Sequence, residues 1–293
     1  TDFSQVGVRV IDDHTLEVTL ENPTPYFLSM HAHYSWWPVQ QKTIEKFGKI
    51  DDRVSRWTRA ENYVGNGPYR LAAWRPNDVI EVRPNPHYWD ADGVMNAGVN
   101  FYPVNNEQTE ERMFRSGELH ITENVPLSKI PLYKRNNPEL YRADAWIGSY
   151  FYRVNVTRKP MSDVRVRKAL AMAIDRKLLV DRVLQGGETP APFLTPPGIN
   201  GYEPSAGVQF DVEGAKNMLA DAGFPGGKGF PTIDILYNTL EKHKIIAEAI
   251  QQMWKENLNI EVTLTNQDWK VYLANTANET LNYDIARAGW IGD

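Results

Sequence analysis

The residue types that most often carry catalysis do not occur in this chain at catalytic spacings. A serine nucleophile on a sharp strand-to-helix turn needs a G-x-S-x-G pattern, which is absent. The acid pairs Asp12-Asp13 and Glu110-Glu111 are adjacent in sequence, and adjacent side chains of a strand or helix point apart, so neither pair can flank one scissile bond. The chain has no cysteine, which excludes thiol nucleophiles, disulfides and zinc–thiolate sites. The sequence therefore predicts no catalytic centre.

Two other sequence patterns, a pair of histidines and a pair of glycines, are only weak indications of a metal site or a phosphate site. His31 and His33 would share one face of a strand, but a zinc site needs a third converging ligand, and no second histidine follows His243 at metal spacing. The glycines at 65 and 67 are too few for a phosphate-binding loop and precede a strand, not a helix. We expect no metal and no cofactor.

Aromatic residues beside polar ones are more informative. The chain has nine tryptophans and fourteen tyrosines, and a core position is the ordinary alternative for each of them. Trp269, however, directly follows Asn266-Gln267-Asp268, and Trp290 follows Arg287-Ala288-Gly289. Aromatic walls with a few placed polar groups hold a ligand in a concave site without reacting with it. This combination favours a binding protein over an enzyme.

The hydrophobic periodicity predicts an α/β architecture that must position these residues. Up to about residue 147 the chain is rich in strands and turns, and beyond it helices and strands alternate, so we expect two lobes, 1–147 and 148–293. Helix starts are marked by Asp163, Asp175 and Asp211, which are good N-cap residues. The predicted strands lie within 6–20 (a hairpin), 69–73, 79–81, 99–101 and 260–264, and the predicted helices at 107–117, 163–174, 175–186, 211–223 and 241–257.

Composition and charge restrict the partners. With 293 residues, 42% hydrophobic and 24% charged, the chain is long enough for about two folded domains. The net charge of −5 is spread over interleaved residues of both signs without a basic cluster, which argues against nucleic acid and against a polybasic membrane anchor. No run of about 18 apolar residues occurs, so the sequence predicts no membrane-spanning helix.

Eight blocks, distributed along nearly the whole chain, occur in the order of one protein family. They are DDHTLEVTLENPTPYF (12–27), NGPYRLAAWRPND (66–78), NPHYWD (85–90), RSGELHIT (115–122), DVRVRKALAMAIDR (163–176), LYNTLEKHK (236–244), NQDWKVYL (266–273) and DIARAGWIGD (284–293). Through these blocks the chain resembles the oligopeptide-binding proteins of bacterial ABC peptide importers, which belong to the dipeptide/oligopeptide/nickel class of extracellular solute-binding proteins.

The resemblance implies a periplasmic-binding-protein-like α/β fold with mixed sheets, whose two lobes close on a ligand. Family members extend beyond this sequence in both directions, so we expect the chain to be incomplete at both ends. Residues 1–147 would then belong to the strand-rich lobe that carries the termini, and 148–293 to the lobe with the peptide-contacting segment. The implied protein is a receptor in the periplasm, or a lipoprotein on the outer face of the cytoplasmic membrane. It would deliver short peptides with a free amino terminus to the importer's membrane subunits.

The resemblance also assigns roles to single residues. Asp293 matches the acid that receives the peptide's α-amino group, and Gly289 and Trp290 match the segment whose backbone pairs with the peptide as an added strand. Four further residues match positions that line side-chain pockets or the region of the peptide's carboxylate: Arg287, Trp269, Asn238 and His243. For His243, a surface position at a helix start is the alternative.

Three positions depart from the family's pattern. Arg153 stands where better-known members carry an acidic residue, directly after Tyr150-Phe151-Tyr152, so we expect a preference for acidic over basic ligand side chains. Gly148 and Ile291 replace a cysteine pair that some members place beside the ligand. Thr276 replaces an arginine, which puts a carboxylate clamp at this position in doubt.

Two alternatives remain beside the peptide receptor. Within the family, the ligand would be a dipeptide, a murein peptide, a nickel complex or a sugar. From another class, the chain would be a peptide or glycan hydrolase, which needs a convergent acid/base pair or a nucleophile.

Overall fold

The computed structural model describes residues 6–52, 55–144 and 146–292. The chain forms two compact units, one up to Pro103 and one from Val104 to Gly292. Segment 104–144 belongs to the second unit, where Lys134 Nζ donates to the carbonyl of Gln185 at 2.8 Å. The lobe boundary predicted at residue 147 concerns the whole receptor and stays a prediction. Among the described residues no helix is long and apolar enough to cross a membrane.

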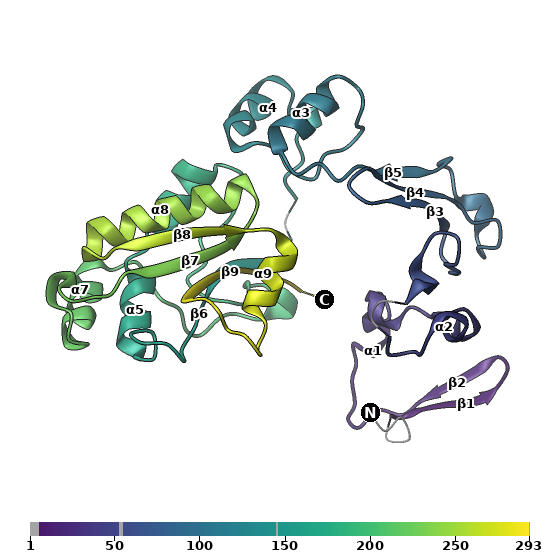
Figure 1. Cartoon of the computed structure of the whole chain (residues 1–293), viewed down its shortest axis with the longest axis horizontal. Helices are drawn as coiled ribbons and strands as arrows, with labels where there is room; N and C mark the ends of the chain where they lie inside the picture. Colours follow the sequence, from purple (N-terminus) through teal and green to yellow (C-terminus); the bar gives the residue numbers. More distant parts are fainter. Residues whose placement is uncertain (1–5, 53–54, 145, 293) are drawn as a thin grey trace. The chain divides into compact units, whose positions relative to one another are not determined.

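The first unit consists of small antiparallel sheets joined by turns. Its predicted hairpin is confirmed, with the Asp12 carboxylate accepting from the backbone N–H of His14 at 2.8 Å in the turn. His31 and His33 do not lie on a strand, because His31 ends a short helix and His33 begins a 3₁₀ turn. The elements are β1 (Val8–Asp12), β2 (Thr15–Val18), α1 (Phe27–Met30), α2 (Gln41–Phe47), β3 (Tyr69–Arg75), β4 (Val79–Pro84) and β5 (Val99–Phe101) (Figure 1).

The second unit is built on a mixed four-stranded sheet of order β6-β9-β7-β8 (Figure 1). Strand β7 is parallel to both β8 and β9, whereas β6 is antiparallel to β9. The elements of this unit are α3 (Glu107–Arg115), α4 (Ile130–Asn136), β6 (Gly148–Val154), α5 (Val164–Met172), α6 (Arg176–Leu178) with a π-helical continuation (Leu179–Leu184), α7 (Val212–Asp221), β7 (Ile233–Asn238), α8 (Glu241–Leu258), β8 (Val262–Gln267), α9 (Trp269–Thr276) and β9 (Ile285–Ile291).

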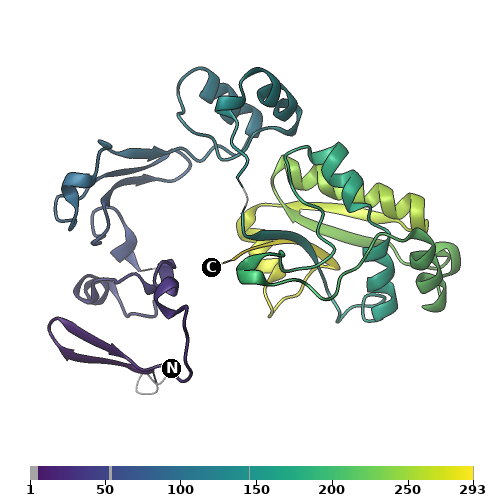
Figure 2. The ribbon, with the colours of Figure 1, turned by 180° about the vertical axis from the view of Figure 1, so that it is seen from behind.

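Helices cover both faces of this sheet, since alternate residues of its strands point into different clusters. Ile235 and Ile285 pack with buried residues of α5, α7 and α8, and Leu236 and Ala286 pack with Tyr272 of α9. In Figure 1 and, from behind, in Figure 2, α8 runs alongside the strands. Mixed pairing with helices on two faces confirms the predicted α/β class.

The predicted helix starts are confirmed by their caps. The carboxylates of Asp163, Asp175 and Asp211 accept from backbone N–H groups of the following turn at 2.8 to 2.9 Å. In α8, which lies at the predicted helix 241–257, the apolar residues Ile246, Ile250, Met253 and Trp254 are buried along one stripe. Trp254 donates its indole N–H to the carbonyl of Leu170 at 2.8 Å. This bond ties α8 to α5 and fixes the layer that supports β7 and β9.

Replacing Trp254 by Phe should lower the free energy of unfolding by about 1–3 kcal/mol, because the buried carbonyl of Leu170 loses its donor. Urea unfolding of the variant and its parent would measure the difference. Trp146, 74% exposed in the same unit, provides the control, since Trp146→Phe should change stability by no more than about 0.5 kcal/mol. Equal stability of Trp254→Phe and the parent would show that this bond is dispensable.

Candidate ligand-binding site

Strand β9 is paired along its whole length on one side only. Its ladder with β6 runs from the pair Val154–Ile285 to the pair Gly148–Ile291. On its other side, β7 pairs with it only at Ile285 and Ala286. Because Ala286 directs its own backbone groups to β6, the parallel pair Leu236–Ala286 is bonded through the neighbours of Ala286, namely Ile285 and Arg287. From Ala288 onward, that edge of β9 has no strand partner in the described part of the chain.

The hydrogen bonds of the β6 ladder tell which backbone groups point to the open edge. Asn155 N–H donates to the carbonyl of Asp284 at 2.9 Å, and Gly292 N–H donates to the carbonyl of Ile147 at 2.7 Å. Even-numbered residues of β9 therefore direct their N–H and C=O toward β6, and odd-numbered ones direct theirs to the opposite edge. The exposed residues Gly289 and Ile291 thus present donors and acceptors to an incoming extended chain.

Arg287 lies at the start of this edge, with its side chain over the ring of Tyr150. The guanidinium carbon is 5.0 Å from the ring centroid, and Nη1 is 3.4 Å from Oδ1 of Asn238. Its Nε is buried without a hydrogen-bond partner, and no carboxylate of the described residues forms an ion pair with it. A half-buried arginine of this kind has unused capacity for an anionic group such as a carboxylate.

His243, in the first turn of α8, completes this group. It is only 4% exposed, so the surface alternative is wrong, and its Nδ1 lies 3.3 Å from the hydroxyl of Tyr150. Burial lowers the pKa of His243 from 6.5 to about 3, and the charges of Arg287 and Lys242 act in the same direction. Burial also raises the pKa of Tyr150 to about 12. At neutral pH the uncharged imidazole is therefore suited to accept from the Tyr150 hydroxyl.

The structure brings three of the predicted residues together around Tyr150, namely Arg287, Asn238 and His243. The sequence reasoning did not single out Tyr150 itself. Its signal was the aromatic triplet at 150–152, whose alternation on a strand directs the two tyrosines to one face.

Arg153 and Trp290 lie on the opposite face of the β6–β9 pair from Tyr150. Trp290 is paired with Ser149 and is 63% exposed, and Arg153 is paired with the small, buried Ala286. The Arg153 guanidinium lies 5.8 Å from the ring centroid of Tyr283. Its Nε, like that of Arg287, is buried without a partner.

The remaining predicted positions are also located by the structure. Trp269 begins α9 and stacks on Tyr272 at 5.6 Å, and it is half exposed. Gly148 and Ile291 face each other across the ladder. Thr276 is buried, and its hydroxyl donates to the carbonyl of Tyr272 at 2.9 Å. Its side chain therefore forms a hydrogen bond within α9.

Asp293 lies outside the described residues. Its predicted role as the partner of a peptide's amino group therefore stays a prediction.

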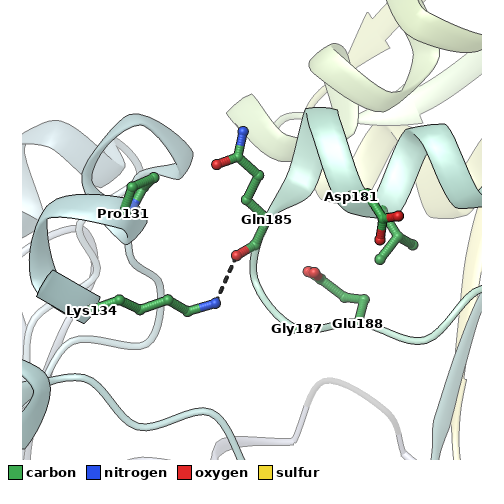
Figure 3. Close-up of a pocket in the computed structure, with 7 residues that line it drawn as sticks. Pro131, Lys134, Asp181, Gln185, Gly187 and Glu188 are labelled. Atoms are coloured by element: carbon green, nitrogen blue, oxygen red, sulfur yellow. Dashed lines mark hydrogen bonds between the residues drawn. The ribbon is translucent and has the colours of Figure 1, made fainter.

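A pocket of about 430 Å³ lies elsewhere in the second unit, between α4 and the π-helical segment Leu179–Leu184 with the residues that follow it (Figure 3). At its rim Lys134 Nζ donates to the Gln185 carbonyl, where the helix ends. Glu188 also lines it and is held by Lys242 at 2.5 Å. None of the described residues of the predicted site lines this pocket, so the binding hypothesis does not depend on it.

Comparison with known proteins gives a family match over the full sequence. Residues 1–293 match the model described as bacterial extracellular solute-binding proteins, family 5 Middle. The periplasmic oligopeptide-binding protein OppA of Salmonella typhimurium is 39% identical over 297 residues, covering 99% of this chain and 53% of that protein. The periplasmic murein peptide-binding protein MppA of Escherichia coli is 37% identical, with the same coverage. The chain thus spans about half the length of the curated relatives it matches.

Solved structures agree with this match. Haemophilus influenzae OppA in complex with the peptide RPPGFSPFR superposes with a TM-score of 0.86 at 34% identity, covering 98% of this chain and 56% of that one. The predicted periplasmic-binding-protein-like fold is confirmed by this similarity.

The free energy of unfolding should fall at acidic pH because of His243. Between pH 6.5 and about 3 the unfolded chain binds a proton at this residue and the folded chain does not, so stability falls as the pH is lowered through that range. The slope from this one group reaches about 1.4 kcal/mol per pH unit. Urea unfolding at several pH values should show a flatter profile for His243→Gln, whereas His14→Gln, in an exposed turn, should follow the parent. Parallel profiles for His243→Gln and the parent would contradict the assignment.

Proposed function

Since the chain belongs to the bacterial extracellular solute-binding proteins of family 5, we propose that it is part of a receptor that captures short peptides and delivers them to an ABC importer. The observation that carries the proposal is the open edge of β9, where Gly289 and Ile291 offer backbone donors and acceptors. Every peptide has the same backbone groups, so pairing of this kind holds peptides of many sequences. The receptor works in the periplasm, or as a lipoprotein on the outer face of the cytoplasmic membrane.

The ends of the peptide have complementary partners in this proposal. Asp293 follows β9 and receives the free α-amino group, so the peptide runs antiparallel to β9. Its later residues then approach Arg287, which has no carboxylate partner among the described residues and is suited to an anionic group. Asn238 of β7 accepts a hydrogen bond from this arginine, and His243 of α8 contacts the hydroxyl of Tyr150, over whose ring the guanidinium lies. Trp290 and Trp269 supply exposed aromatic surface for peptide side chains.

The proposed role is capture without chemistry. The relatives are solute-binding receptors, and this protein is proposed to return its peptide unchanged. Intact peptide, recovered after prolonged incubation and measured by mass spectrometry, is the expected result. Cleavage of any incubated peptide would favour the hydrolase alternative instead.

The role of Asp293 is tested by calorimetric titration of the protein expressed over its full natural length. A tri- or tetrapeptide with a free amino terminus should bind roughly a hundredfold more tightly than its N-acetylated form, because breaking a buried charge pair costs about 3–5 kcal/mol. Asp293→Asn should weaken binding of the free peptide to a similar extent. The two losses should not add, since each removes one partner of the same contact. Equal binding of the acetylated peptide would shift the proposal toward a nickel, sugar or modified-peptide ligand.

We further propose that Arg153 gives the receptor a preference for acidic ligand side chains. Its guanidinium has no carboxylate partner in the described chain, and the Ala286 opposite it is small. In a panel of peptides that differ at one position, Glu should bind about tenfold more tightly than Lys at the position that meets Arg153. Arg153→Glu should reverse the order. A preference of the parent protein for Lys at that position would exclude this role.

A further inference from the structure

We propose that Tyr272 closes the pairing edge of β9 at Arg287 and thereby sets where the ladder with a bound peptide stops. The inference rests on the proposed function, in which a peptide is added as a strand beside Gly289 and Ile291. It assigns a positioning role to a residue outside the predicted site.

The hydroxyl of Tyr272 donates to the backbone carbonyl of Arg287. This carbonyl belongs to an odd-numbered residue of β9 and so points to the edge that faces away from β6. It is also the first such carbonyl after the pairing with β7 has ended at Ala286. Tyr272 therefore occupies the acceptor that a peptide strand would otherwise reach next after Gly289.

The donor is held firmly in place. Tyr272 is 3% exposed and packs with Leu236, Tyr283 and Ala286 beneath the strands. Its backbone N–H donates to the carbonyl of Asp268 at 2.8 Å, and the ring of Trp269 stacks on its own ring. A phenol fixed in this way has one position for its hydroxyl, so an approaching peptide N–H cannot displace it by a small side-chain movement.

The consequence is a short ladder. An antiparallel strand exchanges hydrogen bonds with every second residue of its neighbour, which here means Ile291 and Gly289 and then Arg287. The carbonyl oxygen of Arg287 could accept a second hydrogen bond, but the buried ring and hydroxyl of Tyr272 occupy the approach to it on the edge that faces away from β6. The peptide N–H two residues beyond the one that faces Gly289 therefore does not reach this acceptor. Backbone pairing with β9 therefore covers about three peptide residues. In any longer peptide, the residues after these three do not form backbone hydrogen bonds with β9.

The test replaces each backbone amide of a hexapeptide, one at a time, by an ester, which removes one N–H donor and keeps the side chains. Binding of the six-residue series to the full-length protein is measured by calorimetry. In the parent protein, the ester at the residue facing Gly289 should weaken binding about three- to tenfold, and the ester two residues farther along should have no effect. In Tyr272→Phe, the second ester should become costly as well, since the Arg287 carbonyl is then open to the peptide.

Tyr283→Phe is the matched control, because it removes a tyrosine hydroxyl from the same buried cluster and keeps the ring. This variant should show the same ester profile as the parent protein. Thermal unfolding shows whether both variants are folded. A loss from the second ester in the parent protein, or identical profiles for Tyr272→Phe and the parent, would overturn the role of Tyr272. If no ester at any position weakens binding, the strand-addition proposal itself fails, which is a distinguishable result.

Discussion

The difference in length between the two ladders of β9 is the constraint on which the candidate site depends. Pairing with β6 over seven residues keeps 285–291 extended, while β7 leaves the opposite edge after Ala286. A free strand edge normally attracts other strands, including those of another copy of the same chain. Here the open stretch is short, since the carbonyl of Arg287 is taken by Tyr272. In the proposed function, this short edge forms several backbone hydrogen bonds with a peptide. A long strand of another chain could pair with it over only a few residues.

The arginines of the second unit occur in two kinds of environment. Arg158 and Arg165 form ion pairs with Asp284 and Asp163, at 3.1 and 2.6 Å. Arg153 and Arg287 instead lie over tyrosine rings on opposite faces of β6–β9, and no carboxylate of the described residues is paired with either. A ring face offsets part of the cost of desolvating a cation, but the buried Nε–H of each arginine still has no hydrogen-bond partner. Each arginine therefore keeps a buried donor for which the described residues of the second unit supply no anion.

Much of this arrangement was predictable from local sequence, and the rest was not, for physical reasons. The helix caps and the apolar stripe of α8 depend on neighbouring residues, and the family blocks pointed to Arg287, Asn238 and His243. Strands β6 and β7 were not predicted, because GSYFYRV and IDILYN mix polar and charged residues with apolar ones without a regular period of two. The contact of His243 with Tyr150 joins residues that are 93 positions apart, and the proposed role of Tyr272 depends on where β7 stops pairing. Periodicity shows which face of an element is buried, but it does not show where a ladder ends.

The protonation states around Tyr150 leave Arg287 as the charged member of the group formed by Arg287, Asn238 and His243. Desolvation keeps His243 uncharged, so its ring accepts a hydrogen bond while Arg287 carries the positive charge of the group. A protonated His243 would place a second cation beside Tyr150 without an acid to balance it, which is why burial and the charge of Arg287 lower its pKa together. A bound carboxylate would balance the charge of Arg287 and leave a neutral set of groups. The aromatic and neutral partners of Arg287 thus make a carboxylate of the ligand its natural counter-charge.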